Sequence, residues 1–417
     1  MTQKTQSVGG HNLTAIKWLT FLMFTMFAMT TDSVGVIIPE VIKEFKLSMT
    51  AAGAFHYAPM SAIAIAGIMF GYFADKLGRK RTIILGLVLF ALNSYLFAVG
   101  TTFAVFLMLL VVSGAAIGIF KTGALALIGD ISKSTTEHTS LMNAVEGFFG
   151  VGAIIGPLIV ARLLELHVSW KWLYVIAGSI CMILIITASL VRYPETKGSA
   201  AEPLDFRRTV KMIGNPYAFG FSMAAFLYVA TECAIYVWMP TLLEGYKGNF
   251  LKIALYATSI FFVLRAAGRF LGAWVLSKYS WSTVLVLMSS AILVCFLGSV
   301  IGGVNVAVLL LPLSGLFMSV IYPTVNSKGI SCFPKHQHGA VAGVILFFTC
   351  GAAAIGPLMM GAISDLLGDP IYGFILATGF AAMLCIGTIY NVLRKPADAR
   401  LLMLEKSEYQ GANAASK

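Results

Sequence analysis

The sequence predicts an all-α membrane protein with twelve transmembrane helices, arranged as two six-helix bundles related by a pseudo-two-fold axis. Three observations favour this fold class. Hydrophobic residues make up 59% of the 417 residues and charged residues only 11%, whereas roughly a quarter of residues are charged in soluble proteins. Apolar runs of about 20 residues, long enough to cross a bilayer, recur along the chain. The two halves of the chain also share a sequence repeat.

Twelve apolar spans are separated by polar breaks. They lie near 15–42, 50–75, 82–99, 103–130, 137–164, 170–192, 214–245, 250–279, 281–301, 304–330, 337–366 and 370–394. The first span is too long for a cleaved signal peptide, so we expect it to remain as a helix. The polar stretch 193–213 predicts a cytoplasmic linker between a first bundle, 15–192, and a second bundle, 214–394. The tails 1–14 and 395–417 are then cytoplasmic.

The charge distribution predicts the orientation of the chain. An excess of 29 Lys and Arg over 18 Asp and Glu gives a net charge of +11. These basic residues are dispersed over loops, which argues against a nucleic-acid partner. Most lie on the two tails, the linker and alternate loops, and such residues face the cytoplasm. We therefore expect a multi-pass protein of the plasma membrane, the inner membrane of a bacterium, with both termini in the cytoplasm. The six cysteines show no metal-ligand spacing, and we expect no metal site.

An internal repeat supports the two bundles. Residues 148–158 of the fifth span, Phe-Phe-Gly-Val-Gly-Ala-Ile-Ile-Gly-Pro-Leu, match residues 348–358 of the eleventh span at six of eleven positions. Small residues let membrane helices pack closely, and the shared Gly-Pro loosens a helix where it bends. The repeat therefore predicts that each half is one copy of the same bundle.

A short charged run joins the second and third spans. It reads Gly-Tyr-Phe-Ala-Asp-Lys-Leu-Gly-Arg-Lys-Arg from Gly71 to Arg81, and its glycines allow close packing and a tight turn. This spacing resembles the signature between the second and third helices of major facilitator superfamily (MFS) transporters. The resemblance implies the MFS fold and a secondary transporter that works by alternating access, with a substrate site between the halves.

The same resemblance implies a conformational gate at the cytoplasmic face. An aspartate at a helix end holds such a gate shut by attraction to the helix dipole, and in this family the cluster stabilises the outward-open state. The expected gate residues are Gly71, Asp75, Gly78, Arg79 and Asp130.

A narrower resemblance rests on four patches. They are 143–153 in the fifth span, 226–232 in the seventh, 268–272 in the eighth and 318–324 in the tenth. Together they resemble the fucose/glucose:proton symporter family. This resemblance implies proton-coupled transport of a sugar or sugar derivative.

Five charged residues lie deep enough within the spans to be functional candidates, because a charge at the bilayer centre costs at least ~2.5–3.5 kcal/mol. They are Asp32, Lys121, Glu146, Glu232 and Arg265. Their spacing predicts two pairs on neighbouring helices, Lys121 with Glu146 and Glu232 with Arg265. We expect the three carboxylates to take part in proton coupling.

At one position the residue type in this chain differs from that in the sugar symporters. That family has a carboxylate, tied to proton coupling or substrate binding, where this chain has Lys121. The departure makes Asp32 the preferred proton carrier. The family match implies that Glu146 and Glu232 lie at substrate-binding positions. Lys121 and Arg265 suit a carboxylate or phosphate group of an anionic substrate.

Three further residues complete the expected substrate site. Tyr322 and Asn326 are four residues apart, so they share a helical face and offer a hydroxyl and an amide to a polar solute. Trp238 suits stacking on a sugar face and equally suits an anchor at the membrane interface.

No nucleotide-binding loop, zinc spacing or nucleophile elbow occurs in the sequence, which argues against ATP-driven transport and against an enzyme. We expect a monomer without a cofactor, driven by the proton gradient, whose partners are a small-molecule substrate and the lipid bilayer. Three alternatives remain open: a symporter of an organic anion held by Lys121 and Arg265, a drug or metabolite:proton antiporter, and a receptor without transport. The direction of transport and the choice between proton and sodium also stay open.

Overall fold

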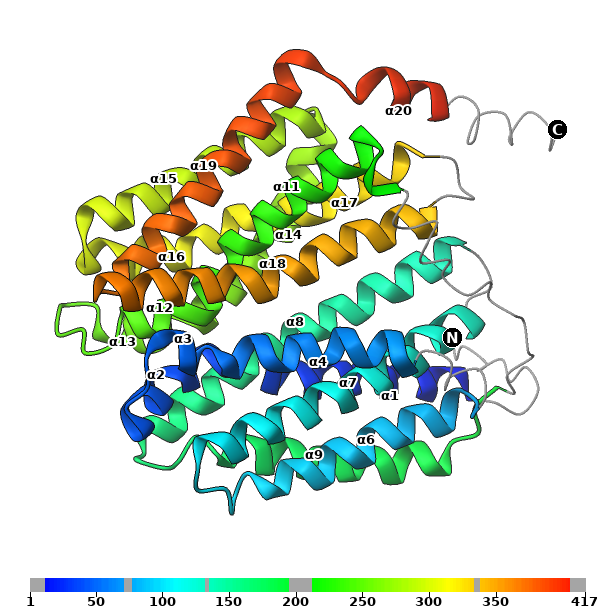
Figure 1. Cartoon of the computed structure of the whole chain (residues 1–417). Helices are drawn as coiled ribbons and strands as arrows, with labels where there is room; N and C mark the ends of the chain where they lie inside the picture. The colour runs from blue at the N-terminus through cyan, green and yellow to red at the C-terminus, as the bar shows by residue number, and fades with distance from the viewer. Residues whose placement is uncertain (1–11, 71–76, 132–134, 195–211, 334–337, 406–417) are drawn as a thin grey trace, which may run out of the picture. The chain divides into compact units, whose positions relative to one another are not determined.

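The computed structural model describes residues 12–70, 77–131, 135–194, 212–333 and 338–405. Within these ranges the chain forms helices joined by turns and short connections, and no strand occurs there (Figure 1). The all-α prediction is confirmed for this part of the chain.

The chain divides into two compact units. Unit 1 comprises residues 1–47 and 54–199, and unit 2 comprises residues 48–53 and 200–417. The division after residue 199 falls within the predicted linker, most of which lies outside the described residues. The six residues 48–53 are separated in sequence from the rest of their unit.

Unit 1 is a bundle of helices packed pairwise. Its helices are α1 (Leu13–Thr31), α2 (Val34–Phe45), α4 (Ala54–Phe70), α6 (Arg79–Leu96), α7 (Phe103–Ile131), α8 (Thr135–Glu165) and α9 (Trp172–Leu190). Helix α1 packs on α8, α4 packs on α7, and α6 packs on both α7 and α9. The rings of Phe27, Phe90 and Phe120 meet in its core.

Unit 2 contains the short helix α3 and the second set of long helices. These are α3 (Met49–Ala52), α11 (Pro216–Cys233), the π-helix η1 (Ala234–Trp238), α12 (Met239–Leu242), α13 (Leu251–Leu255), α14 (Ala257–Lys278), α15 (Trp281–Gly302), α16 (Val304–Met318), α17 (Ile321–Ser331), α18 (His338–Leu367), α19 (Ile371–Arg394) and α20 (Asp398–Glu405). The pairing in unit 1 recurs here: α11 packs on α18, α14 on α16, and α15 on both α16 and α19. The units are therefore two copies of one packing scheme, as the sequence repeat predicts.

The repeated small residues lie at close helix contacts. On α8, a Cβ added to Gly152 would collide with the Thr25 carbonyl of α1, and one added to Gly156 would collide with the Met29 carbonyl. On α18, a Cβ added to Gly356 would lie 3.2 Å from Ala230 of α11. The motif therefore sets the same close contact in each unit.

In the described part of the chain, nine helices or joined helices are long and apolar enough to cross a membrane. Helices α4, α6 and α14 fill the remaining predicted spans. Helix α4 has 17 described residues, α6 begins with three basic residues, and α14 carries Arg265 and Arg269.

Several predicted spans are interrupted. The first is broken at Asp32 and Ser33, between α1 and α2. The seventh changes from α-helix to π-helix directly after Cys233, and the tenth breaks between Met318 and Ile321. Interrupted helices mark binding sites in many transporters because the break leaves backbone groups open to a ligand. The side chains beside these breaks are therefore candidates for a functional site.

Candidate functional site

The centre of unit 2 holds a buried ion pair. Arg265 Nη2 on α14 lies 2.9 Å from Glu232 Oε1 on α11. The same oxygen accepts a 2.8 Å hydrogen bond from the Tyr228 hydroxyl. The Glu232 side chain is 7% exposed and that of Arg265 is 23% exposed. The predicted pairing of Glu232 with Arg265 is thus present in the structure.

Local helix geometry explains this cluster. Tyr228 and Glu232 are four residues apart on α11, so they lie one above the other on one face. Glu232 is the penultimate residue of α11, directly before the π-helix η1. Short π-helices are rare in proteins, and those that do occur are often found at functional sites. Sequence reasoning missed Tyr228, and its four-residue spacing from Glu232 was the available signal.

The cluster leaves hydrogen-bonding groups for a solute. Both donors bind Glu232 Oε1, and no described residue donates to Oε2. The Tyr322 ring on α17 stacks on Tyr228 with centroids 6.2 Å apart. Asn326, one turn further along α17, has a buried side-chain oxygen that accepts no hydrogen bond from the described residues. Of the four predicted site residues, Glu232, Arg265 and Tyr322 therefore meet around Tyr228, and Asn326 lies one turn beyond Tyr322 on α17.

Trp238 has a different environment. Its ring is 1% exposed, and its Nε1 donates a 3.1 Å hydrogen bond to the Pro357 carbonyl of α18. A Cβ added to Gly53 or Gly361 would lie 3.0 Å or 3.1 Å from the indole. In this structure the indole is a packing element between glycines, and a substrate contact by Trp238 stays a prediction.

In unit 1, Asp32 lies at the break between α1 and α2. It is half-buried, and its Oδ2 accepts a 2.8 Å hydrogen bond from the Thr31 hydroxyl. The neighbouring Ser33 is buried and its hydroxyl donates to the Met29 carbonyl. The preferred proton carrier therefore lies where the first span is interrupted, which sequence hydropathy did not indicate.

The predicted pair of Lys121 with Glu146 is not formed. Lys121 on α7 is half-buried, and its ammonium lies 5.5 Å from the centre of the Phe149 ring on α8. Glu146, three residues before Phe149, is exposed. Equal depth on neighbouring helices does not fix the rotation of each helix, and here the α8 face toward Lys121 presents Phe149. The prediction of this ion pair was wrong for this structure.

The predicted gate is only partly described. Gly78 has a φ of +84° directly before α6, a conformation that side chains rarely adopt. Arg79 follows as the first residue of α6 and is 8% exposed. Gly71, Asp75 and the side chain of Asp130 lie outside the described residues. The gate therefore stays a prediction.

Comparison with known proteins gives a consistent result. A model of the Major Facilitator Superfamily matches residues 20–357. The L-fucose-proton symporter of Escherichia coli (strain K12) is 24% identical over 404 residues, covering 87% of this chain and 90% of that protein. The quinolone resistance protein NorA of Staphylococcus aureus (strain MRSA252) is 26% identical over 373 residues, covering 85% and 92%.

The fold is shared with a solved transporter. The crystal structure of the nucleoside transporter NupG aligns with a TM-score of 0.71 and 16% identity, covering 90% of this chain and 98% of that one. The family model spans both units, and the helices and their repeated pairing fit the twelve-helix, two-bundle fold. The chain therefore belongs to the Major Facilitator Superfamily and is a multi-pass membrane transporter, not an enzyme.

Proposed function

We propose that this chain is a proton-coupled symporter of a small, neutral, polyhydroxylated solute such as a sugar or sugar derivative. The observation that carries the proposal is the closed Glu232–Arg265 pair in unit 2. Each charge of this pair already has its partner. The cluster therefore offers hydrogen bonds to a solute without offering an excess of charge.

The chemistry of the cluster suits hydroxyl groups. Glu232 Oε2 can accept a hydrogen bond from a solute hydroxyl, and the side-chain amide of Asn326 and the hydroxyl of Tyr322 can bond further polar groups of the solute. An anionic solute would have to displace Glu232 from Arg265, which would leave a buried carboxylate without its partner. A neutral solute avoids this cost, and stacked tyrosine rings suit the apolar face of a sugar.

Proton coupling belongs, in this proposal, to the carboxylates, with Asp32 as the carrier and Glu146 and Glu232 assisting. Asp32 lies at an interrupted helix, and such breaks hold coupling ions in other transporter folds. The predicted gate from Gly71 to Asp130 would set the balance between outward-open and inward-open states. We place the protein in a bacterial inner membrane as a monomer without a cofactor, with cytoplasmic termini.

Two relatives bear on the choice of solute. The L-fucose-proton symporter, 24% identical, matches most of the chain. The NorA relative, 26% identical, is named for quinolone resistance, so export of an aromatic drug is an outcome that a direct test must include.

Uptake into proteoliposomes tests the proposal. Purified protein is reconstituted, an inward proton gradient is imposed, and radiolabelled L-fucose, D-glucose, D-glucuronate and norfloxacin are supplied separately. We expect accumulation of a neutral sugar that collapses with a protonophore and persists without sodium. Accumulation of glucuronate alone, or extrusion of norfloxacin against its gradient, would contradict it.

One observation favours a second candidate, the symport of an organic anion. Lys121 is half-buried and forms no ion pair with a described residue. A basic group near an aromatic ring in a dry site is a natural partner for a carboxylate. D-glucuronate uptake in the same experiment, lost when Lys121 is replaced by Gln, would favour this candidate.

A further inference from the structure

In unit 2 a buried tyrosine is bonded to the carboxylate of the ion pair. Tyr228 is 1% exposed, and its hydroxyl donates a 2.8 Å hydrogen bond to Glu232 Oε1. Both residues lie on α11, four positions apart, so the helix itself sets this contact. Burial makes the contact important, because a hydroxyl group that is buried without a partner costs free energy.

The contacts on this carboxylate are one-sided. Arg265 Nη2 lies 2.9 Å from Oε1, the same oxygen that accepts the hydrogen bond from Tyr228. Among the described residues, no donor lies on Oε2. A guanidinium and a carboxylate frequently form a different pair, in which two parallel N–H groups bind both oxygens. The observed pair therefore leaves open an oxygen that such a two-sided pair would occupy.

The position of Tyr228 accounts for this arrangement. The terminal torsion of a glutamate side chain is broad, so the plane of its carboxylate turns easily unless a contact fixes it. The Tyr228 hydroxyl approaches Oε1 from α11 and the Arg265 guanidinium approaches it from α14. The Tyr322 ring stacks on the Tyr228 ring, with centroids 6.2 Å apart, and limits the movement of the phenol. Two donors on different helices thus meet at one oxygen and fix the plane of the carboxylate.

We propose that Tyr228 is a positioning residue that keeps the Glu232–Arg265 pair one-sided, so that Glu232 Oε2 remains an acceptor for a hydroxyl group of the solute. The assignment rests on the proposed function, because it requires a solute that donates a hydrogen bond at this point. A site built to bind a hydroxyl group rejects analogues that lack it. The competing explanation is a hydrogen bond that only stabilises unit 2.

Infrared spectroscopy of the full-length protein in lipid nanodiscs tests the positioning without a solute. Subtracting the spectrum of the matching Glu232→Gln variant isolates the two stretching bands of this carboxylate. These bands lie closer together when both oxygens are bonded alike than when one oxygen takes the contacts. We expect the separation to narrow in Tyr228→Phe, because the guanidinium then binds both oxygens.

A second substitution separates this turn of the carboxylate from the simple loss of a hydrogen bond. Lysine is a point charge and lacks the fork of arginine, so Tyr228→Phe/Arg265→Lys should keep the wide separation of the bands. An unaltered separation in Tyr228→Phe would overturn the proposal. Equal narrowing in the double variant would do the same, since a lysine cannot form the two-sided pair.

Tyr174→Phe is the matched control. Tyr174 is also 1% exposed, and its hydroxyl oxygen bonds no described residue. The same chemical change in unit 1 should leave the carboxylate bands unaltered. Narrowing as large as that in Tyr228→Phe would show that general loosening of the protein moves the bands, and the proposal would fail.

Fluorinated sugars test the consequence for the solute. Binding of D-glucose is compared with binding of deoxyfluoro analogues that replace its hydroxyl groups one at a time, because fluorine cannot donate a hydrogen bond. We expect at least one analogue to bind the wild type about tenfold more weakly than D-glucose. In Tyr228→Phe this preference should fall below about threefold, and in Tyr228→Phe/Arg265→Lys it should return.

The two readouts separate the proposal from the proposed function. A hydrogen bond that only stabilises unit 2 would leave the preference for D-glucose over its analogues unchanged in Tyr228→Phe, which would refute the positioning role. If the bands narrow as expected but the wild type neither binds nor accumulates a neutral sugar, the proposed symport fails and the control of the ion pair by Tyr228 stands. If D-glucose accumulates and the bands do not move, the symport stands and the role of Tyr228 fails.

Discussion

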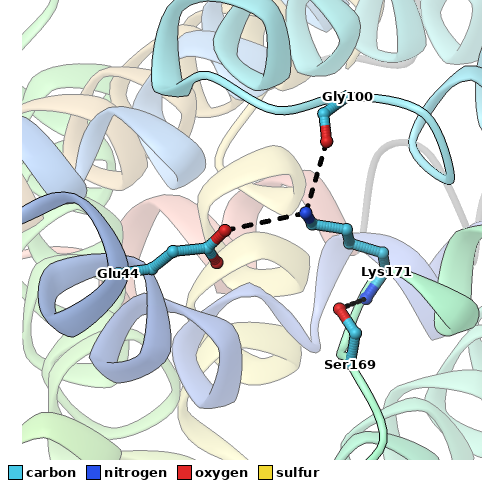
Figure 2. A network of polar contacts seen from close by, with 4 residues as sticks. All are labelled: Glu44, Gly100, Ser169 and Lys171. Atoms are coloured by element: carbon cyan, nitrogen blue, oxygen red, sulfur yellow. Dashed lines mark hydrogen bonds and ion pairs between the residues drawn. The ribbon is translucent and has the colours of Figure 1, made fainter.

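The two units hold their charged side chains in different ways. In unit 2 the Glu232 carboxylate, where α11 meets the π-helix η1, is paired with Arg265 of α14, with 2.9 Å between the charged atoms. In unit 1, Lys171 and Glu44 form an ion pair near helix ends, with 3.6 Å between Lys171 Nζ and Glu44 Oε1. The same ammonium group donates to the Gly100 carbonyl (Figure 2). The intramembrane charges of unit 1 are Asp32, Lys121 and Glu146.

Those charges lie at different helices and in different surroundings. Asp32 is bonded to a threonine hydroxyl at a helix break, Lys121 lies over the Phe149 ring, and Glu146 is exposed. A charge that already has an ionic partner resists a change of protonation, because the partner stabilises its charged form. This difference agrees with the proposed roles, in which Asp32 is the proton carrier and Glu232, held by Arg265, only assists.

The largest expected effect follows from this assignment. Asp32→Asn should abolish proton-driven accumulation while leaving exchange of solute across the membrane partly intact, because an amide cannot carry the proton. Proteoliposome uptake with and without a proton gradient measures both activities. Glu40→Gln is the control, since Glu40 is a carboxylate of α2 paired with Lys43 at 3.0 Å. Normal accumulation in Asp32→Asn would move the coupling role to Glu146 or Glu232.

The second prediction concerns the ion pair of unit 2. Arg265→Gln should destabilise the protein by about 3 kcal/mol, because it leaves the Glu232 carboxylate buried without its cation. The double variant Arg265→Gln/Glu232→Gln should recover much of this loss, since no charge is then stranded. Thermal unfolding of the purified proteins gives the double-mutant cycle. A double variant as unstable as Arg265→Gln would show that packing, not charge pairing, sets the cost.

The counterpart in unit 1 is Lys121→Gln, for which we expect a smaller loss of stability. The lysine contacts a ring and no described carboxylate, so its loss should cost about 0.5–1 kcal/mol of stability. Binding of a neutral sugar should change by less than about threefold. Binding of neutral and acidic sugars at two pH values decides the role of the lysine. If an acidic sugar binds tightly to the wild type and not to the variant at either pH, Lys121 is a substrate anchor.

Local patterns in the sequence predicted much of the fold. Apolar runs located the long helices, the Gly-Pro repeat located the close contact of α8 on α1 and of α18 on α11, and helical spacing predicted the contact of Glu232 with Arg265. These features depend on residues a few positions apart or on an internal repeat, and both can be read directly.

Other features depend on the rotation of helices and on distant partners. The pairing of Lys121 with Glu146 failed because depth in the membrane does not say which face of α8 meets α7. The cap of α3 by Asp365 joins residues more than 300 positions apart. The break at Asp32 leaves the hydropathy of the first span unchanged, so an apolar pattern cannot show it.

At the ends of their helices the two units are alike, because in each a basic side chain donates to backbone carbonyls. Removing this contact gives the smallest expected loss of stability. In unit 1 the Lys80 ammonium donates to the carbonyls of Ser189 and Val191 at the end of α9. In unit 2 the Arg400 guanidinium donates to the Cys332 carbonyl at the end of α17. A cation at a helix C-terminus contributes typically 0.3–1 kcal/mol, so Lys80→Ala and Arg400→Ala should each cost about that much.

The Cys332 thiol distinguishes the two variants. Burial raises the pKa of Cys332 from 9.0 to about 11, so at pH 8 the protonated, unreactive thiol dominates, and labelling by a maleimide should rise only as the pH approaches 11. Arg400 also lies over the Tyr217 and Phe333 rings, at 4.8 Å and 5.1 Å, and so holds α20 against this site. Arg400→Ala removes a positive charge that itself lowers the pKa of Cys332, but burial is the larger influence on that pKa. If release of α20 exposes the thiol, the net effect should be a lower pKa and better access, so that labelling at pH 8 accelerates. Lys80→Ala should leave that rate unaltered, and equal acceleration in both variants would mean that general loosening, not release of α20, exposes the thiol.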